Sequence, residues 1–239
     1  MYTFIDLCCG FGAMTKAFEK TGLFKCVLAA DIDPNMRAHY KYLLDGRKPI
    51  GDITKEENKK IIKKTDFNVL VAGICNLNEN IFFPLLEIIE ENQPKAFLIE
   101  MGTEVIYSSF CKNIDIFCKE QGYHFVGYED GFEGLKLNLM NFGIPEYCER
   151  AYCVCIKQEY AVADLLKLNK NHDYRCYEHT KYNPDKFIEQ KRGLDWAFRD
   201  FNFLIGTPEL SKKTIVENAS PIPVVVNIAL SIGLDFLKK

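Results

Sequence analysis

The stretch FIDLCCGFGA, residues 4–13, decides the fold, because a strand pattern runs through a glycine-rich turn into a helical pattern. Gly10 and Gly12 let the backbone turn tightly and approach a ligand closely. The amino end of the following helix offers N–H groups that have no partner within the helix, and a polar ligand can bind there. An ordinary turn between a strand and a helix has the same pattern, so a cofactor site and a plain turn both remain open.

The next strand pattern carries a candidate ligand for a ribose. Residues 26–30 are apolar and end at Asp31, which follows the glycines by about twenty residues. A carboxylate at such a place accepts hydrogen bonds from both ribose hydroxyls. The alternative is that Asp31 only caps the helix that begins near Pro34. Further along, GDIT at residues 51–54 makes Asp52 a candidate partner for the amino group of an adenine.

Short apolar runs alternate with amphipathic segments along most of the chain. This alternation predicts an α/β fold, with helices on both faces of a mostly parallel sheet. Ligands of such folds bind at the carboxyl ends of the strands, which is where the glycine turn lies. The expected strands are residues 2–7, 26–30, 69–73, 96–99, 124–128, 135–138 and 151–156, and the expected helices are residues 13–20, 35–44, 81–91 and 109–121.

The pattern changes after Lys157. Residues 158–213 are rich in tyrosine and in charges of both signs and have weak periodicity, which predicts a small inserted lobe. The last stretch, PIPVVVNIALSIGLDFLKK, is an apolar helix with prolines near its start, where proline is tolerated. We therefore expect one domain built from residues 1–157 and 214–239, with the lobe inserted between these two parts.

The composition of the 239-residue chain argues against several classes of protein. A formal net charge of -3 does not suit a protein that coats nucleic acid by charge alone. The 10 cysteines lie partly in apolar runs and form no matched metal-binding pairs, so we expect buried reduced thiols and no metal site. No signal peptide and no membrane-spanning run are recognisable, so we expect a soluble, intracellular protein of the cytoplasm, or of the nucleus if the source has one, without a membrane partner.

Several motifs together resemble those of DNA cytosine-C5 methyltransferases. DLCCGFGAMTKAFEKTG, AADIDPNMRAHY, GDITK and AGIC follow one another in the order and spacing of the first four motifs of that family. FLIEM is similar to its Glu-Asn-Val motif, and LNLMNFGIPEYCERAYCVC to its Gly-x-Pro-Gln-x-Arg-x-Arg segment. VENASPIPVVVNIAL is similar to its final helix, which returns beside the first motif. The resemblance covers nearly the whole chain outside the expected lobe.

The resemblance implies a Rossmann-like, S-adenosylmethionine-dependent methyltransferase fold with a site for S-adenosylmethionine or S-adenosylhomocysteine. Cys8 stands where the family has an aromatic residue, and Ala13 stands where it has the second glycine of a pair. Loss of an aromatic contact is expected to weaken cofactor binding by about 1 kcal/mol. The cofactor-binding residues that the resemblance implies are Asp6, Cys8, Gly10, Gly12, Asp31, Ile32, Asp52, Ile53, Gly73, Asn218 and Ala219.

The resemblance also implies a catalytic set. In this family a cysteine thiolate adds to C6 of a flipped cytosine, which makes C5 nucleophilic enough to take a methyl group. The nucleophile belongs to a Pro-Cys-Gln turn, for which the chain has AGICNL at residues 72–77. Aligned without a gap, Asn76 takes the place of the nucleophile, whereas a one-residue deletion brings Cys75 there. Glu100 matches the glutamate that binds N3 of the base, and Arg150 matches an arginine that holds the base.

The catalytic end departs further from the family pattern. Only residues 77–80 stand where the family has a long loop that closes over DNA. Met101 and Gly102 replace the Asn-Val of the glutamate motif, and Cys148 replaces an arginine. Without closure, water is not excluded and the nucleophile is not positioned. These departures predict that methyl transfer to cytosine is lost or impaired.

We therefore expect a homologue that keeps cofactor binding and acts as a binding or regulatory protein, or as the partner subunit of an active methyltransferase. Two alternatives stay open. One is an active enzyme that uses Cys75, with a partner or on another small substrate, and the other is a structural role without cofactor. DNA is a possible partner, but recognition by this chain alone is expected to be weak, because the charges of residues 158–213 are nearly balanced.

Overall fold

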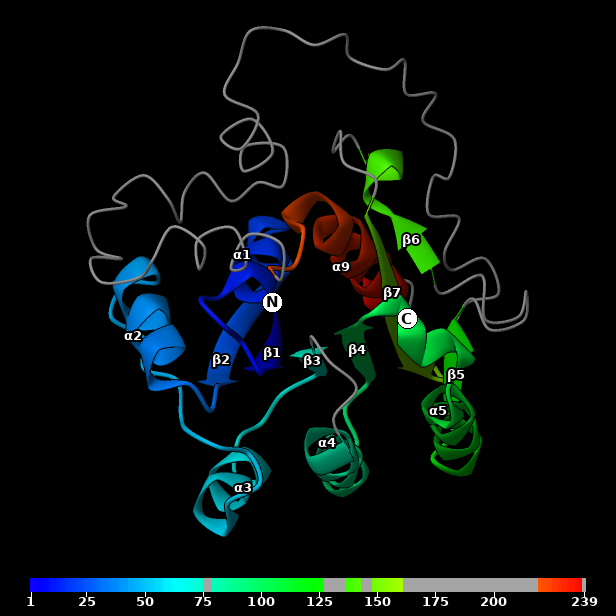
Figure 1. Ribbon diagram of the computed structural model, residues 1–239, viewed down its shortest axis with the longest axis horizontal. Coiled ribbons are helices and arrows are strands. Elements are labelled where there is room, and N and C mark those ends of the chain that lie inside the picture. The colour runs from blue at the N-terminus through cyan, green and yellow to red at the C-terminus, as the bar shows by residue number, and fades with distance from the viewer. Residues whose placement is uncertain (75–78, 127–135, 143–147, 161–218, 238–239) are drawn as a thin grey trace, which may run out of the picture.

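The computed structural model describes residues 1–74, 79–126, 136–142, 148–160 and 219–237 (Figure 1). Cys75, Asn218 and nearly all of the expected lobe at residues 158–213 lie outside these residues. The expected division of the chain into a domain and a lobe therefore stays a prediction.

The strands are β1 (Tyr2–Leu7), β2 (Phe24–Ala30), β3 (Val69–Ile74), β4 (Ala96–Met101), β5 (Tyr123–Val126), β6 (Lys136–Asn138) and β7 (Glu149–Lys157). They form one 7-stranded sheet in the order β2-β1-β3-β4-β7-β5, and β6 pairs with β7. The pairs among β2, β1, β3 and β4 are parallel, whereas β7 is antiparallel to β4, β5 and β6. Next to β2, Ile50 forms an isolated parallel bridge with Ala30. The prediction of a mostly parallel sheet is confirmed.

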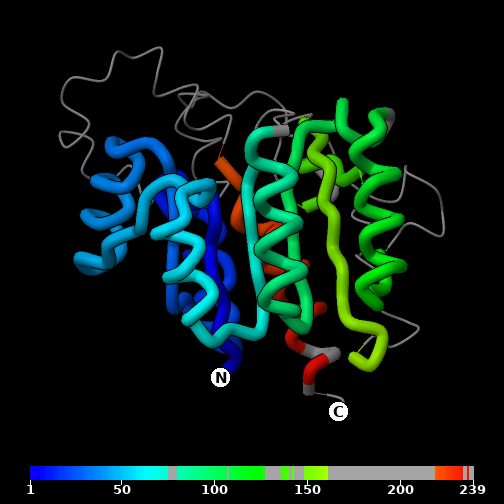
Figure 2. The backbone as a smooth tube through the Cα atoms, turned by 90° about the horizontal axis from the view of Figure 1, so that it is seen from below, coloured from blue at the N-terminus to red at the C-terminus, as the bar shows by residue number. Residues whose placement is uncertain are grey.

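The helices are α1 (Ala13–Lys20), α2 (Pro34–Leu43), α3 (Glu56–Lys63), α4 (Glu79–Asn92), α5 (Ser109–Glu120) and α9 (Ile222–Leu237), with short 3-10 helices at Thr103–Tyr107 and Leu139–Phe142. α1 and α9 cover one face of the sheet, and α3, α4 and α5 lie side by side on the other (Figure 1 and Figure 2). The prediction of helices on both faces is confirmed. Within the described residues, no helix is long and apolar enough to cross a membrane.

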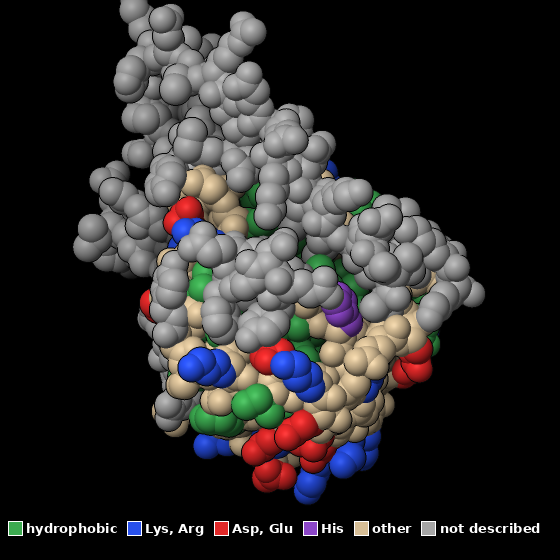
Figure 3. Space-filling model, turned by 90° about the vertical axis from the view of Figure 1, so that its right-hand side faces the viewer, with side chains coloured by type: hydrophobic (Ala, Val, Ile, Leu, Met, Phe, Trp, Pro, Cys, Tyr) green, Lys and Arg blue, Asp and Glu red, His purple; other side chains and the backbone are tan. Residues whose placement is uncertain are grey.

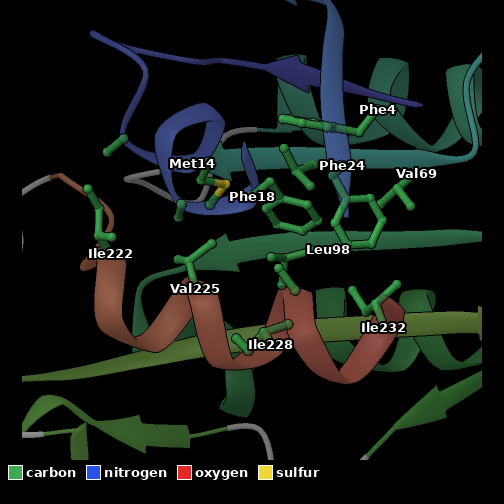
Figure 4. Packing of buried hydrophobic residues seen from close by; sticks show 14 of the residues in the cluster. Phe4, Met14, Phe18, Phe24, Val69, Leu98, Ile222, Val225, Ile228 and Ile232 are labelled. Atoms are coloured by element: carbon green, nitrogen blue, oxygen red, sulfur yellow. The ribbon is translucent and has the colours of Figure 1, made fainter. Parts of the chain in front are cut away.

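Branched apolar residues hold α9 against the sheet. Ile222, Val225, Ile228 and Ile232 recur at helical spacing and are all buried. Figure 4 shows their side chains on the side of α9 that faces the sheet and Phe18 of α1. The predicted C-terminal helix is therefore present, and it packs beside α1 as expected.

The pattern of apolar residues did not predict α3. Its sequence, EENKKIIK, is mostly charged, and only Ile62 is buried on it. The helix nevertheless has acidic residues in its first turn and lysines in its last, which stabilises the helix dipole at both ends. The start of β2 was also placed too late, because Phe24 belongs to the strand and packs on Phe18 with ring centroids 5.2 Å apart.

A cluster of thiols, which we call the thiol cluster, lies between α5 and β7. It consists of Cys111 and Cys118 of α5 and Cys153 and Cys155 of β7, all buried. The Sγ atoms of Cys118 and Cys155 are 3.3 Å apart. Burial raises the pKa of Cys153 and Cys155 well above the ordinary value, because a thiolate there would lose its hydration. As predicted, these cysteines are buried thiols that form no disulfide.

Candidate cofactor-binding site

A cavity of about 340 Å³ lies at the carboxyl ends of β1, β2 and β3. Its volume falls within the range of about 300–1000 Å³ that is typical of small-molecule sites. Carboxylates and apolar side chains share its wall. The lining residues are Asp6, Cys8, Cys9, Gly10, Phe11, Ala13, Met14, Asp31, Ile32, Met36, Asp52, Ile53, Gly73, Ile81, Ala219 and Ser220.

Asp31 directly follows β2, and two backbone N–H groups hold its carboxylate. Gly10 N–H donates to Oδ2 at 2.7 Å, and Asp33 N–H donates to Oδ1 at 2.8 Å. Burial raises the pKa of Asp31, and these two hydrogen bonds oppose the rise. Each carboxylate oxygen has two lone pairs, so both oxygens keep room for a further donor such as a ribose hydroxyl.

The alternative role of Asp31 as a helix cap is excluded. The cap of α2 is Asp33, whose side chain accepts a hydrogen bond from Asn35 N–H at 2.8 Å. Asp31 is instead tied to the turn after β1 and faces the cavity. The sequence did not distinguish these two roles, because both aspartates precede the helix by a few residues.

Asp52 contributes a second carboxylate to the cavity. Its Oδ1 accepts hydrogen bonds from the N–H of Thr54 at 2.9 Å and from the hydroxyl of Thr54 at 2.8 Å. The hydrogen bond from this N–H lowers the pKa of Asp52, so the side chain is ionised at neutral pH. Next to it Ile53 is buried, whereas Ile32 lines the cavity with 63% of its surface exposed. An exposed apolar side chain at a cavity offers a surface to a flat ring.

Asp6, near the end of β1, is fully buried. Its Oδ2 accepts hydrogen bonds from the N–H and the hydroxyl of Thr15 at 3.0 and 2.6 Å. The oxygen of that hydroxyl lies 3.0 Å from the hydroxyl of Tyr40. Burial raises the pKa of Asp6 to about 7, although the hydrogen bonds from Thr15 oppose the rise. The first motif thus places a carboxyl group at the cavity that is partly protonated at neutral pH.

The residues of the turn after β1 differ in their structural roles. Gly10 has a φ of 53° with open space around it, so it is needed for its backbone conformation and for the N–H that binds Asp31. Gly12 has a φ of 98° and begins α1, but it does not line the cavity. Cys8 adopts a φ of 57°, which is uncommon for a residue with a side chain, and it does line the cavity.

On one side of the cavity, β3 lies against the segment that leads into α9. A Cβ atom at Gly73 would lie 3.7 Å from Cε of Met14 and 3.9 Å from Oγ of Ser220, so the walls meet closely there. Ala219 and Ser220 line the cavity, which confirms that the C-terminal segment returns to the first turn. Asn218, the other residue expected from this segment, lies outside the described residues.

The catalytic residues implied by the resemblance are only partly described. Glu100 is buried in β4 beside Gly73 of β3, and Oε1 of Glu100 forms an ion pair with Nε of Arg150 at 3.8 Å. The pairing of β4 with β7 brings these two residues together, and neither lines the cavity. Cys75, which follows β3, lies outside the described residues.

Several lining residues were missed by the sequence analysis, namely Cys9, Phe11, Ala13, Met14, Met36, Ile81 and Ser220. Met36 lies in the first turns of α2, so its place depends on how this helix approaches the cavity. Ile81 gave no signal, because its place depends on where α4 begins. No group of three or more histidine, cysteine, aspartate or glutamate residues in the described part of the chain could hold a metal ion.

The fold and the cavity define a class. A glycine turn after the first strand, a carboxylate after the second and a cavity at the strand ends are typical of Rossmann-like proteins that bind nucleotide cofactors. The methyltransferase EhMeth of Entamoeba histolytica has a similar structure, with a TM-score of 0.69 at 14% identity over 100% of this chain and 99% of that one. The chain therefore has the fold of the S-adenosylmethionine-dependent methyltransferases.

A sequence model of the C-5 cytosine-specific DNA methylase family matches residues 2–220, and the chain belongs to this family. The type II methyltransferase M.HpaII of Haemophilus parainfluenzae is 31% identical over 171 residues, which are 64% of this chain and 45% of that one. M.BsuFI of Bacillus subtilis is 27% identical over 206 residues, which are 80% and 48%. The chain thus spans about half the length of these curated relatives. The cofactor of the family is S-adenosylmethionine.

Proposed function

We propose that the chain binds S-adenosylmethionine or S-adenosylhomocysteine in the cavity at the carboxyl ends of β1, β2 and β3. The observation that carries the proposal is that Asp31 and Asp52 line one cavity together with the exposed side chain of Ile32. In this site the Asp31 carboxylate accepts hydrogen bonds from the ribose hydroxyls, and the Asp52 carboxylate accepts one from the adenine amino group. The side chains of Ile32 and Ile53 pack on the adenine ring. The other residues of the proposed site are Asp6, Cys8, Gly10, Gly73, Asn218 and Ala219, whereas Gly12, which the resemblance also implied, shapes the turn without lining the cavity.

A calorimetric titration with each cofactor tests this site. Asp31→Asn keeps the shape of the side chain but removes its charge, and a hydrogen bond to a charged group contributes about 1.5–3 kcal/mol. We expect the variant to bind at least tenfold more weakly than the wild type. Glu57→Ala, an exposed acid of α3 away from the cavity, is the matched control and should bind as the wild type does. If neither cofactor gives heat or raises the melting temperature, the proposed site is wrong.

The role we propose is that of a cofactor-binding homologue that does not methylate cytosine by itself and serves as a regulatory protein or as the partner of an active methyltransferase. Three features of the sequence support it. Asn76 takes the nucleophile position in the ungapped alignment, Cys148 replaces an arginine, and only residues 77 and 78 separate Asn76 from α4, where the family has its closing loop. We also propose that residues 1–157 and 214–239 form the cofactor domain and that residues 158–213 form a separate lobe.

One observation favours a second function, an active DNA (cytosine-5) methyltransferase that uses Cys75. The ion pair between Glu100 and Arg150 lies one strand away from Gly73, which lines the cavity. In this second function the cofactor supplies the activated methyl group. Glu100 holds N3 of the base, Arg150 fixes the Glu100 carboxylate, and the Cys75 thiolate adds to C6.

A methyl-transfer assay separates the two functions. The isolated chain is incubated with duplex DNA and cofactor labelled in the methyl group, and we expect no label in the DNA. Loss of a nucleophile and its support lowers a rate by several powers of ten, since each factor of ten is about 1.36 kcal/mol of barrier. Cys75→Ser is the control. Label transferred by the wild type but not by this variant, alone or with an added partner, would establish the active enzyme.

A further inference from the structure

The Asp6 carboxyl group has a spare acceptor at the cavity. Thr15 holds Oδ2 through two hydrogen bonds. Within the described residues Oδ1 has no hydrogen-bond partner, although Asp6 is fully buried. A buried acceptor without a partner is unfavourable, so it gains from any donor or cation that a ligand brings. Since Asp6 lines the cavity, its carboxyl group is available to interact with a positive group of a ligand bound there.

Among the described residues no cation is paired with Asp6, and the nearby Arg47 is bound to Glu19, with its Nη1 atom 2.7 Å from Oε1 of that residue. No lysine, arginine or histidine is among the described residues that line the cavity. β3 pairs with β1 through Val71 at this point, and the start of α9 contributes Ala219 and Ser220, none of which titrates. The titratable groups that face Asp6 are Glu19 of α1, Asp31 after β2, Cys9 of the turn, Cys26 of β2 and Tyr40 of α2.

We propose that Asp6 links cofactor binding to a proton and makes the cavity distinguish S-adenosylmethionine from S-adenosylhomocysteine by charge. The inference rests on the proposed cofactor site. S-adenosylmethionine has a positively charged sulfur, whereas the sulfur of S-adenosylhomocysteine is neutral, and both have the same amino and carboxylate groups. When the charged cofactor binds, the O–H bond of the Asp6 carboxyl group breaks, its proton passes to the solvent, and the remaining carboxylate faces the positive charge.

The direction of the pH effect follows from the charges. Burial and the neighbouring acids Asp31 and Glu19 raise the pKa of Asp6 to about 7 in the free protein. A cation in the cavity favours the ionised form and lowers this pKa. The affinity for S-adenosylmethionine therefore rises as the pH increases through about 7, by about tenfold for each unit by which the cofactor lowers the pKa. S-adenosylhomocysteine lowers the pKa of Asp6 less. The affinity for S-adenosylmethionine divided by the affinity for S-adenosylhomocysteine therefore rises with pH.

Calorimetric titrations of the whole chain with both cofactors, from about pH 6 to about pH 8, test the linkage on either side of the pKa. Titrations in two buffers with different ionisation enthalpies give the number of protons released on binding, because the measured heat includes the protonation of the buffer. We expect S-adenosylmethionine to release a larger fraction of a proton than S-adenosylhomocysteine, and the ratio of their affinities to rise several-fold. The positive sulfur also lowers the pKa of the amino group of S-adenosylmethionine relative to that of S-adenosylhomocysteine, but this effect in the free ligands is the same whichever protein is titrated. The ratio in the wild type should therefore rise with pH relative to the ratio in Asp6→Asn, which does not titrate.

Asp52→Asn is the matched control. The pKa of Asp52 is lowered by its hydrogen bonds, so this carboxylate stays ionised over the whole pH range. Its loss should weaken the binding of both cofactors and leave the pH dependence of their ratio unchanged. The comparison separates a general loss of negative charge from the titration of Asp6.

The same pH dependence of the ratio in the wild type and in Asp6→Asn would overturn the linkage and leave the cofactor site standing. No binding of either cofactor at any pH would instead contradict the proposed function. If Asp6→Asn does not fold, Thr15→Val gives a second test. It removes the hydroxyl that donates to Oδ2 and so raises the pKa of Asp6 further. The midpoint of the pH dependence must then move upward, and an unchanged midpoint overturns the proposal.

Discussion

Gly12 connects the first turn to the packing of α2. A Cβ atom at this position would lie 2.4 Å from Cδ1 of Leu44 and 3.0 Å from the ring of Tyr40. The hydroxyl of Tyr40 in turn lies 3.0 Å from the hydroxyl of Thr15, which donates to Asp6. The absence of a side chain at one residue therefore lets α2 approach closely enough to support the buried carboxyl group.

Gly12→Ala should therefore be strongly destabilising. The φ of 98° costs a residue with a Cβ about 1–2 kcal/mol, and the overlap with Leu44 adds about 1–3 kcal/mol. Gly22→Ala is the control, because Gly22 also has a positive φ, 71°, but open space around it. Urea denaturation of both variants measures the difference in the free energy of unfolding. Equal losses in the two variants would show that the contact with Leu44 relaxes without cost.

Asp6→Asn should also change how stability depends on pH. Burial raises the pKa of Asp6 from 3.8 to about 7, so between these values the folded protein holds a proton that the unfolded chain has released. The stability contributed by the protonated carboxyl group is complete below about pH 4 and is lost as the pH rises through about 7. Relative to the variant, the wild type should lose free energy of unfolding between about pH 5 and about pH 8. Denaturation at both pH values measures this, and parallel profiles would contradict it.

The candidate site was predictable where a residue is fixed by its own strand. Asp31 and Asp52 follow strands or a short motif directly, so sequence order was enough to bring them to one cavity. The roles of Met36 and Ile81 depend on the angles at which α2 and α4 approach the sheet, and no local pattern encodes such an angle. The packing role of Gly12 could not be predicted either, because Leu44, which lies next to it in the structure, is remote from it in the sequence.

At the level of elements, the strongest apolar patterns were the most predictable. The expected residues of β1 and α1 agree with the structure, and those of β3 and β4 differ only at the carboxyl ends. The direction of β7 could not be predicted, because an apolar run reads the same whether the strand is parallel or antiparallel. α3 was missed because it buries a single residue, Ile62, and most of its length faces solvent.

α9 is the element whose packing supports both the core and the cavity. Ile228 is fully buried among the residues that join α9, α1 and the sheet, whereas Leu230 is 37% exposed. Ile228→Ala should lower the free energy of unfolding by about 2–5 kcal/mol, since it removes buried methyl groups and leaves a cavity. Leu230→Ala should cost about 1 kcal/mol or less. Comparable losses would mean that α9 is not anchored through this face.

The charge of the whole molecule bears on how tightly the chain is expected to bind DNA. The formal net charge is -3, and Figure 3 shows charges of both signs interspersed over the described part of the face near α5 and β5. Tight binding to phosphates requires lysines and arginines gathered on one surface. The chain also spans about half the length of the curated relatives described above.

We therefore expect the isolated chain to bind duplex DNA only with the affinity of non-specific complexes, with a Kd of about 10⁻⁴–10⁻⁶ M at physiological salt. The affinity should be the same for unrelated sequences and should not change when cofactor is added. Fluorescence anisotropy over a series of salt concentrations measures both points. Nanomolar binding to one sequence would contradict this expectation and would favour the active enzyme.

The thiol cluster between α5 and β7 makes us expect that unfolding by heat is irreversible in air. In the folded protein Cys118 and Cys155 are close together but closed to solvent. Unfolding exposes these thiols, the pKa of Cys155 returns to the ordinary range, and the exposed thiols oxidise in air to random disulfides. A second heating scan in air should therefore show no transition, whereas a scan with a phosphine reductant should repeat the first. Without reductant, the melting temperature from such a scan reflects the rate of irreversible unfolding and not the equilibrium between the folded and unfolded states.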